Sequence, residues 1–441
     1  MLHRPILSKR GETGMMERLL AWVERTLMPP MAKLGEQRHI RAVRDGVVAT
    51  LPLVIVGSFF LLIAFPPVPA WAKAMEPHVA KILIPFRLTV GLMALYASFG
   101  MAFSLARSYG MDGLTSGILG MGAFILTTLP QNIAQLADGS PGPGWVLPFA
   151  NWGGQGLFTA MLVSLLSVEI ARFLYSRKLM FRMPEGVPPA VARSFEALIP
   201  GSVVVTLVWL VRGLLNFDIQ SAIMNLFKPL VVASDSLAGA LIPILLVTLL
   251  WSAGIHGVSV VGPVARPIWY ALFEANAAAA AAGQPLPHIV PEQFFQWFVW
   301  IGGSGMTLSL VLLMVFSRSD YLRKLGRASL LPGIANINEP IIFGTPIVMN
   351  PVLAIPFILA PMAAGTVTYF AMKVGLVGRP FIAPPWTLPG PIGAYLATGG
   401  DWRAAALNLF NVFLGVLIYW PFFRAYERRL EAEAEAKNRT A

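Results

Sequence analysis

The stretch NINEPIIFG, residues 336–344, places an acidic side chain in an apolar sequence. Glu339 precedes Pro340, and a proline removes a backbone donor and biases the residue before it away from helical dihedral angles. We therefore expect a loop or hairpin tip. A carboxylate at such a place can accept the proton of a bound hydroxyl group, because ionisable groups within membrane segments face a cavity or a partner. The alternative is that Glu339 lies at the cytoplasmic surface beside the basic 318–327 segment.

His256 is the second candidate, flanked by Gly254 and Gly257 in WSAGIHGVSVVGP, residues 251–263. A neutral imidazole offers one donor and one acceptor, whereas a carboxylate only accepts. His256 and Glu339 together can therefore recognise a hydroxyl group, which needs both. The alternative is a histidine whose ring is satisfied within helix packing. A metal site is not expected, because no nearby cluster supplies further ligands at helical spacing.

Two tryptophans accompany these groups, Trp251 and Trp386, the latter in APPWTLPGP. A flat aromatic surface suits the apolar face of a sugar ring, although core packing or a place at the membrane interface would explain a tryptophan equally well. Asn151, in NWGGQGLFTA, offers a further amide or, alternatively, a helix N-cap. Charge is scarce among the candidates, which favours a neutral polyhydroxy substrate over an amino acid or an ion.

The chain that must position these residues is strongly apolar. Of its 441 residues, 56% are hydrophobic and 12% are charged, and the mean hydropathy is +0.67. A soluble domain has about 25% charged residues, and a helix that spans a bilayer needs about 20 apolar residues. Several runs approach that length and are continuously apolar, without the alternation typical of β-barrel strands. We therefore predict an all-α polytopic membrane protein.

The net charge of +11 is distributed as basic clusters beside apolar runs. This pattern follows the positive-inside rule and indicates cytoplasmic loops, with no need for a nucleic-acid partner. We expect both termini and four clusters in the cytoplasm: the segment through residue 44, and residues 172–193, 318–327 and 424–429. The chain has no cysteine, so thiol chemistry must occur on another protein.

The apolar runs divide the chain into two halves. The first contains expected spans near residues 46–65, 91–107, 113–130, 156–175 and 195–214. Residues 1–45, with a possible amphipathic helix at 15–40, and residues 216–236 are too polar for spans and are expected to be interfacial or cytoplasmic. Further spans are expected near 237–253, 294–316, 350–373 and 404–423. Glycine and proline interrupt this half at 254–263, 332–340 and 383–393, and such broken backbone commonly lines transporter sites.

GIANINEPIIFGTPIVMNP, residues 333–351, closely resembles the signature of the IIC membrane components of the lactose/cellobiose family of the bacterial phosphotransferase system. Blocks that resemble the same family follow its order at residues 44–67, 251–263, 384–405 and 418–427. The resemblance implies ten transmembrane helices, two re-entrant hairpins and a homodimer in the bacterial cytoplasmic (inner) membrane. Thr345 and the alanine run at 275–287 depart modestly from the family pattern.

The resemblance also implies a mechanism. A scaffold and dimerisation domain (46–215) would be joined by the 216–236 linker to a transport domain (237–425), followed by a cytoplasmic tail (426–441). The transport domain would carry the sugar in an elevator-like motion. Phosphorylation would then come from a phosphocysteine on a separate IIB protein, itself supplied by IIA. No cofactor is implied, and a cysteine-free chain fits this division of labour.

Carried over by motif, Glu339 and His256 would contact the hydroxyl group that receives the phosphoryl group, with Glu339 accepting its proton. The remaining contacts would come from Asn338, Trp251, Trp386, Asn151 and Gly154. The implied substrate is a β-linked disaccharide of the cellobiose or diacetylchitobiose type. Its main rival is an ion-coupled sugar transporter that uses Glu339 as a proton site, and a sugar-sensing membrane regulator ranks last.

Overall fold

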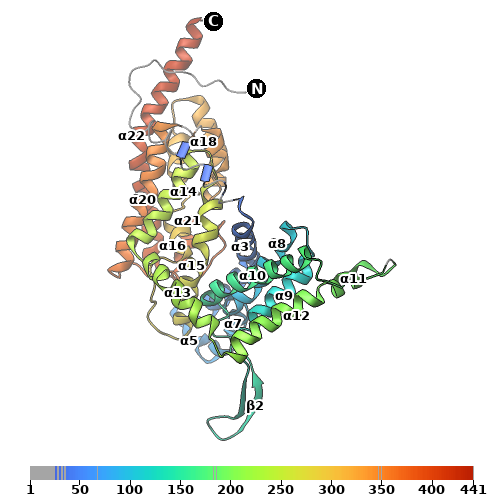
Figure 1. The fold of residues 1–441 in the computed structure, drawn as a ribbon. Coiled ribbons are helices and arrows are strands. Elements are labelled where there is room, and N and C mark those ends of the chain that lie inside the picture. The colour runs from blue at the N-terminus through green and yellow to red at the C-terminus, as the bar shows by residue number, and fades with distance from the viewer. Residues whose placement is uncertain are drawn as a thin grey trace.

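The computed structural model describes residues 25–26, 29–30, 33, 36–66, 68–181, 183–184, 186–345, 347–348 and 350–440. The amphipathic helix expected at 15–40 lies largely outside these ranges. The described chain is mostly helical and forms two packed groups of helices with one projecting β-hairpin (Figure 1). Six described helices are long and apolar enough to cross a membrane, or up to seven if one bent pair counts as a span. The chain is therefore a polytopic helical membrane protein.

The N-terminal half forms the first group, and a helix lies within each of its five expected spans. Its main helices are α3 (Arg38–Ala49), α4 (Leu51–Ala64), α8 (Met93–Ser108), α9 (Gly113–Ile125), α10 (Leu157–Ser176) and α12 (Leu198–Trp209). Its shorter ones are α5 (Pro69–Met75), η2 (Glu76–His78), α6 (Val79–Ile82), α7 (Ile84–Thr89), η3 (Val90–Leu92), η4 (Gly154–Gly156), α11 (Pro189–Glu196) and the π-helix η5 (Leu210–Leu214). A Cβ added at Gly100 of α8 would lie 2.9 Å from the Gly46 Cα of α3. Small residues permit this close helix contact.

A β-hairpin connects α9 to α10. Strands β1 (Gln131–Gln135) and β2 (Pro141–Val146) pair antiparallel, with Gln131 opposite Val146. In Figure 1 this hairpin projects at the end of the molecule opposite the C-terminal end of α22 (Trp402–Thr440). The connection between α9 and α10 is therefore well separated from the C-terminal end of the chain.

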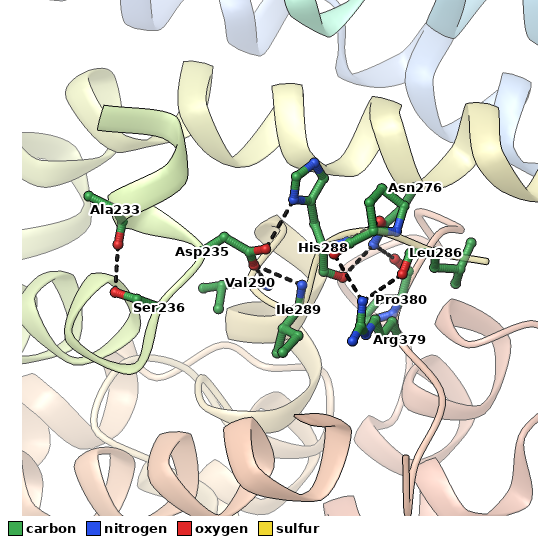
Figure 2. Close-up of polar contacts among 11 residues, drawn as sticks. Ala233, Asp235, Ser236, Asn276, Leu286, His288, Ile289, Val290, Arg379 and Pro380 are labelled. Atoms are coloured by element: carbon green, nitrogen blue, oxygen red, sulfur yellow. Dashed lines mark hydrogen bonds and ion pairs between the residues drawn. The ribbon is translucent and has the colours of Figure 1, made fainter. Parts of the chain in front are cut away.

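A sharp elbow lies between the two groups of helices. The mixed segment expected to be an interfacial linker contains helix α13 (Ile219–Ser234), which meets α14 (Leu237–Ser252) at an angle of 82°. Asp235 fixes the elbow, because its Oδ1 accepts the backbone N–H groups of Ile289 and Val290, each at 2.8 Å. Its Oδ2 lies 3.0 Å from Nδ1 of His288 (Figure 2).

The C-terminal half forms the second group, in which α14 is followed by both long and short helices. They are α15 (Gly257–Ala281), α16 (Glu292–Phe298), α17 (Thr307–Val315), α18 (Asp320–Ile334), α19 (Glu339–Gly344), α20 (Pro351–Lys373), α21 (Gly390–Ala397) and α22. Interruptions were expected at residues 254–263, 332–340 and 383–393, and each of these segments contains non-helical backbone.

One expected span is wrong: residues 294–316 do not form a continuous helix. α16 ends at Phe298 and α17 begins at Thr307, because the segment between them turns through positive φ angles at Gly302, Gly303, Gly305 and Met306. Glycine adopts such angles without the steric penalty that a side chain brings. The turn opens the backbone next to the candidate site.

Helix α15 belongs to the packing of both halves. Its residues Ala265 and Trp269 lie in the hydrophobic core of the second half. Tyr270, Phe273 and Ala277 lie in the core that the first half builds from α3, α4, α8 and α10. The helix therefore carries contacts between the two groups.

Candidate functional site

A cavity of about 340 Å³ lies where the two halves meet. The first half contributes an apolar face of α4, formed by Leu51, Val54 and Ile55. The second half contributes the polar and aromatic lining from α14, α15 and α16, from the glycine turn, and from the loops at 336–338 and 383–386. Its volume falls at the lower end of the range typical of small-molecule sites, about 300–1,000 Å³.

His256 is the N-cap of α15 and lines this cavity. Its Nδ1 accepts the backbone N–H of Ser259 at 3.2 Å and lies 3.0 Å from the Ser259 hydroxyl oxygen. Because Nδ1 is occupied as an acceptor, the neutral ring carries its proton on Nε2. His256 therefore offers a donor to a ligand. In this geometry, the proton of a ligand hydroxyl group must be accepted by a group other than His256.

Glu339 begins α19 immediately after the cavity-lining Asn338. Its side chain is exposed and lies beside the cavity lining, close enough to act electrostatically on the His256 ring. The Asn338 side chain is buried, and its Nδ2 donates to the backbone carbonyl of Ser304 at 3.0 Å. The structure thus places the expected histidine and amide in the cavity lining, and the expected carboxylate next to the amide, exposed and outside that lining.

Asn336 was not expected in the site, yet it ties three cavity segments together. Its Oδ1 accepts the Gly302 N–H at 3.0 Å, and its Nδ2 donates to the carbonyls of Trp386 at 2.8 Å and Leu388 at 3.1 Å. The residue adopts a left-handed φ of 62°, which asparagine tolerates better than most side chains. Asn336 therefore positions the loop that carries Trp386.

Both expected tryptophans line the cavity. The Trp251 ring packs 4.4 Å from the His256 ring, centroid to centroid, and is buried, whereas Trp386 is 47% exposed. Trp269, Trp297 and Trp300 also line the cavity and were missed. The aromatic wall is therefore larger than expected. It suits the apolar faces of sugar rings.

The expectation that charge is scarce in the site is wrong. Arg266 of α15 and Glu292 of α16 both line the cavity, together with Gln293 and Gln296. Arg266 and Glu292 could have been identified from the sequence, because ionisable residues inside apolar segments are functional candidates by default. No group of three or more His, Asp or Glu residues in the described part of the chain is placed to hold a metal ion.

Asn151 and Gly154 lie outside this cavity. Asn151 lines a separate hollow with Thr128 and Gln220, near the β-hairpin. Gly154 packs against α15, where an added Cβ would lie 2.6 Å from the Tyr270 carbonyl oxygen. In this conformation the first half therefore reaches the cavity through α4, and Gly154 serves close packing between the two halves.

Comparisons with known proteins agree with this architecture. Residues 44–361 match the family model of the phosphotransferase system EIIC component. The chain is 42% identical to the cellobiose-specific EIIC component of Geobacillus stearothermophilus, covering 96% of this chain and 97% of that one. It is also 42% identical to the lichenan permease IIC component of Bacillus subtilis (strain 168), covering 92% and 93%.

A solved structure is similar over nearly the whole chain. The crystal structure of the transporter ChbC, the IIC component of an N,N'-diacetylchitobiose-specific phosphotransferase system, matches with a TM-score of 0.87 and 41% identity. The match covers 94% of this chain and 99% of that one. The chain belongs to the EIIC family of phosphotransferase-system permeases.

Proposed function

We propose that this permease binds a β-linked disaccharide of the cellobiose or diacetylchitobiose type and presents one of its hydroxyl groups for phosphorylation by phospho-IIB. The observation that carries the proposal is the end of the cavity where Trp251, His256 and Asn338 meet beside Glu339. Aromatic surface for a ring and polar groups for its hydroxyls are the two requirements of a neutral sugar. The named substrates of the relatives are of the same class.

The transfer step divides its work between this chain and its partner. The sugar hydroxyl oxygen forms a bond to phosphorus while the phosphorus–sulfur bond on IIB breaks and leaves a cysteine thiolate. The hydroxyl proton passes to the Glu339 carboxylate. His256 donates from Nε2 and orients the oxygen, because its Nδ1 is held by Ser259. The exposure of Glu339 suits a group that must meet an incoming protein.

The architecture supports movement of the sugar between the two sides of the membrane. We infer a homodimer with ten spans and two re-entrant hairpins in the cytoplasmic membrane, both termini in the cytoplasm, and a second half that moves as an elevator. Two separate hydrophobic cores and the elbow between α13 and α14 support this division into a scaffold and a transport domain.

The rival reading is an ion-coupled transporter with Glu339 as its proton site. Membership of the phosphotransferase EIIC family disfavours it. The two mechanisms also differ in product, since the rival delivers unmodified sugar and needs an ion gradient. Membrane vesicles supplied with cellobiose and phosphorylated IIB distinguish them by the formation of sugar phosphate.

The test is Glu339→Gln, which keeps the size of the side chain and removes its ability to accept a proton. Loss of a positioned base lowers a rate by about 10²–10⁴-fold, so IIB-dependent phosphorylation falls by at least about 100-fold while sugar binding stays within about threefold. Glu76→Gln is a matched control, because Glu76 is also exposed and begins a short helix before a proline. Wild-type phosphorylation by Glu339→Gln would remove Glu339 from the mechanism.

A further inference from the structure

A hollow of about 600 Å³ lies on the first group of helices, lined by α3, α8 and α9, and is called the α3–α8 hollow below. In the described chain, no residue lines both this hollow and the cavity at His256. Helices α3 and α8 belong to two of the segments that are long and apolar enough to cross a membrane. An occupant of the α3–α8 hollow is therefore distinct from the sugar and meets the protein on its spanning helices.

An aromatic stripe on α8 forms one wall of the α3–α8 hollow. Tyr96, Phe99 and Phe103 follow one another at intervals of three and four residues, which places them on one face of the helix. The rings of Phe99 and Phe103 stack with their centroids 6.0 Å apart. Gly117 of α9 leaves room for this wall, because a Cβ added there would lie 2.7 Å from the Phe99 ring. Met121 extends the apolar lining, so the wall suits a hydrocarbon chain.

Charged groups line the other end of the α3–α8 hollow. Asp45 of α3 accepts the Ser104 hydroxyl group at 2.9 Å and the Arg44 guanidinium group at 2.9 and 3.0 Å. Arg107 is exposed in the last turn of α8, with its guanidinium carbon 5.7 Å from the centre of the Phe103 ring. No ion pair within 4.0 Å involves Arg107 in the part of the chain that the structure describes. The Asp45 charge is thus neutralised by the protein, whereas the Arg107 charge is not.

The two ends of the α3–α8 hollow lie at different depths in a membrane. Arg107 follows Tyr96 by 11 residues, which rise by roughly 16 Å along α8. The hydrocarbon core of a bilayer is about 30 Å thick, so this rise corresponds to about one leaflet. Because α8 ends at Ser108, Arg107 lies near the headgroups and Tyr96 lies near the middle of the bilayer. In the proposed topology this leaflet faces the cytoplasm.

We propose that the α3–α8 hollow binds one anionic phospholipid, with its phosphate group on Arg107 and one acyl chain along the aromatic wall. A guanidinium group matches a phosphate with two parallel N–H donors. Basic pockets between transmembrane helices on the cytoplasmic side are places where anionic headgroups bind. A zwitterionic lipid gains less here, because its ammonium group meets a carboxylate that Arg44 and Ser104 already occupy. The site therefore prefers an anionic lipid to a zwitterionic one.

The test measures thermal unfolding of the detergent-purified full chain as phosphatidylglycerol or phosphatidylcholine is added. A ligand of the folded state raises the unfolding midpoint as its concentration exceeds its Kd. Wild-type protein should bind phosphatidylglycerol at least about tenfold more tightly than phosphatidylcholine, since the two differ by one charged contact. Arg107→Gln should lose this preference. Equal binding of both lipids by the wild type, or an unchanged preference in Arg107→Gln, would overturn the proposal.

Arg87→Gln is the matched control for a lost positive charge. Arg87 is also exposed in the last turn of a helix of the first group, α7, and it does not line the α3–α8 hollow. This variant should keep the wild-type preference for phosphatidylglycerol. A loss of preference equal to that of Arg107→Gln would show a general effect of surface charge and would overturn the proposal.

A second measurement distinguishes a lipid from a second copy of the chain as the occupant. The chain has no cysteine, so Ala49→Cys introduces a single thiol group in the lining of the α3–α8 hollow. In detergent this thiol should react readily with a maleimide, and phosphatidylglycerol should slow the reaction more than phosphatidylcholine does. A thiol that is already protected in detergent alone, or one that phosphatidylglycerol leaves equally reactive, would count against the lipid site.

Discussion

The asparagine that organises the site gives the sharpest prediction, because its role is positional. Asn336→Ala removes three hydrogen bonds, one from Gly302 and two to the 386–388 loop. At about 1 kcal/mol each they sum to about 3 kcal/mol, and about 1.4 kcal/mol corresponds to a factor of ten. If this energy holds the Trp386 loop in its binding geometry, cellobiose affinity falls by about 100-fold. The direct assay is equilibrium binding by tryptophan fluorescence.

A second substitution distinguishes the hydrogen bond that the Asn336 side chain accepts from the two that it donates. Asn336→Asp keeps an acceptor for the Gly302 N–H but removes the donors to the Trp386 and Leu388 carbonyls. It should lose most of the affinity that Asn336→Ala loses, because the Trp386 loop is released in both. Retention of wild-type affinity by Asn336→Asp would show that the loop does not depend on these donors.

Asn216 supplies the control for backbone strain. It also adopts a left-handed conformation, with φ of 53°, and it lies outside the cavity lining. Asn216→Ala therefore carries the same conformational penalty without the positional role. The change in strain should shift the midpoint temperature of thermal unfolding by a similar amount in both alanine variants. Only Asn336→Ala should lose sugar affinity. Wild-type affinity in Asn336→Ala would refute the reasoning.

The helical membrane architecture could be predicted because it follows from bulk properties of the sequence. Apolar runs and basic clusters define spans in any fold, and the first half follows them closely. The missed break within residues 294–316 has a physical reason. Glycine lowers hydropathy little, so a window averages across the turn at 299–306, whereas the positive φ angles of Gly302 and Gly303 stop the helix.

Helix α15 shows the opposite error of local reasoning. The interruption was expected to extend over residues 254–263, yet α15 begins at Gly257 and runs to Ala281 through Pro263 and Pro267. Packing against the cores of both halves outweighs the local cost. Continuity of this helix places Arg266 in the same cavity as His256.

The placement of His256 and Asn338 in one cavity could be predicted because each lies in a compact motif. Asn338 and Glu339 are adjacent in sequence, and His256 comes from one further segment that lines the same cavity as Asn338. Asn336, two residues before Asn338, was missed because its contacts reach segments about 34 and 50 residues away. Residues that position others leave no local pattern, and their role follows only from the three-dimensional fold.

Three further predictions concern binding and stability. Trp386→Ala should weaken cellobiose binding by about tenfold through loss of ring contact, as measured by titration. Hydrogen bonds from Thr115 lower the pKa of the Asp112 carboxyl below its usual value, so its stabilisation is present at neutral pH and is lost as the pH falls through the folded-state pKa. Asp112→Ala should thus cost about 1 kcal/mol at pH 7 and less under strongly acidic conditions, in thermal unfolding. Asp235→Ala should cost more, about 2–4 kcal/mol, because it leaves two backbone N–H groups of the 289–290 segment unpaired at the elbow. Asp235→Asn keeps the accepting oxygen and should recover most of that loss. Equal stability of the alanine variant and the wild type would show that the elbow does not depend on this carboxylate.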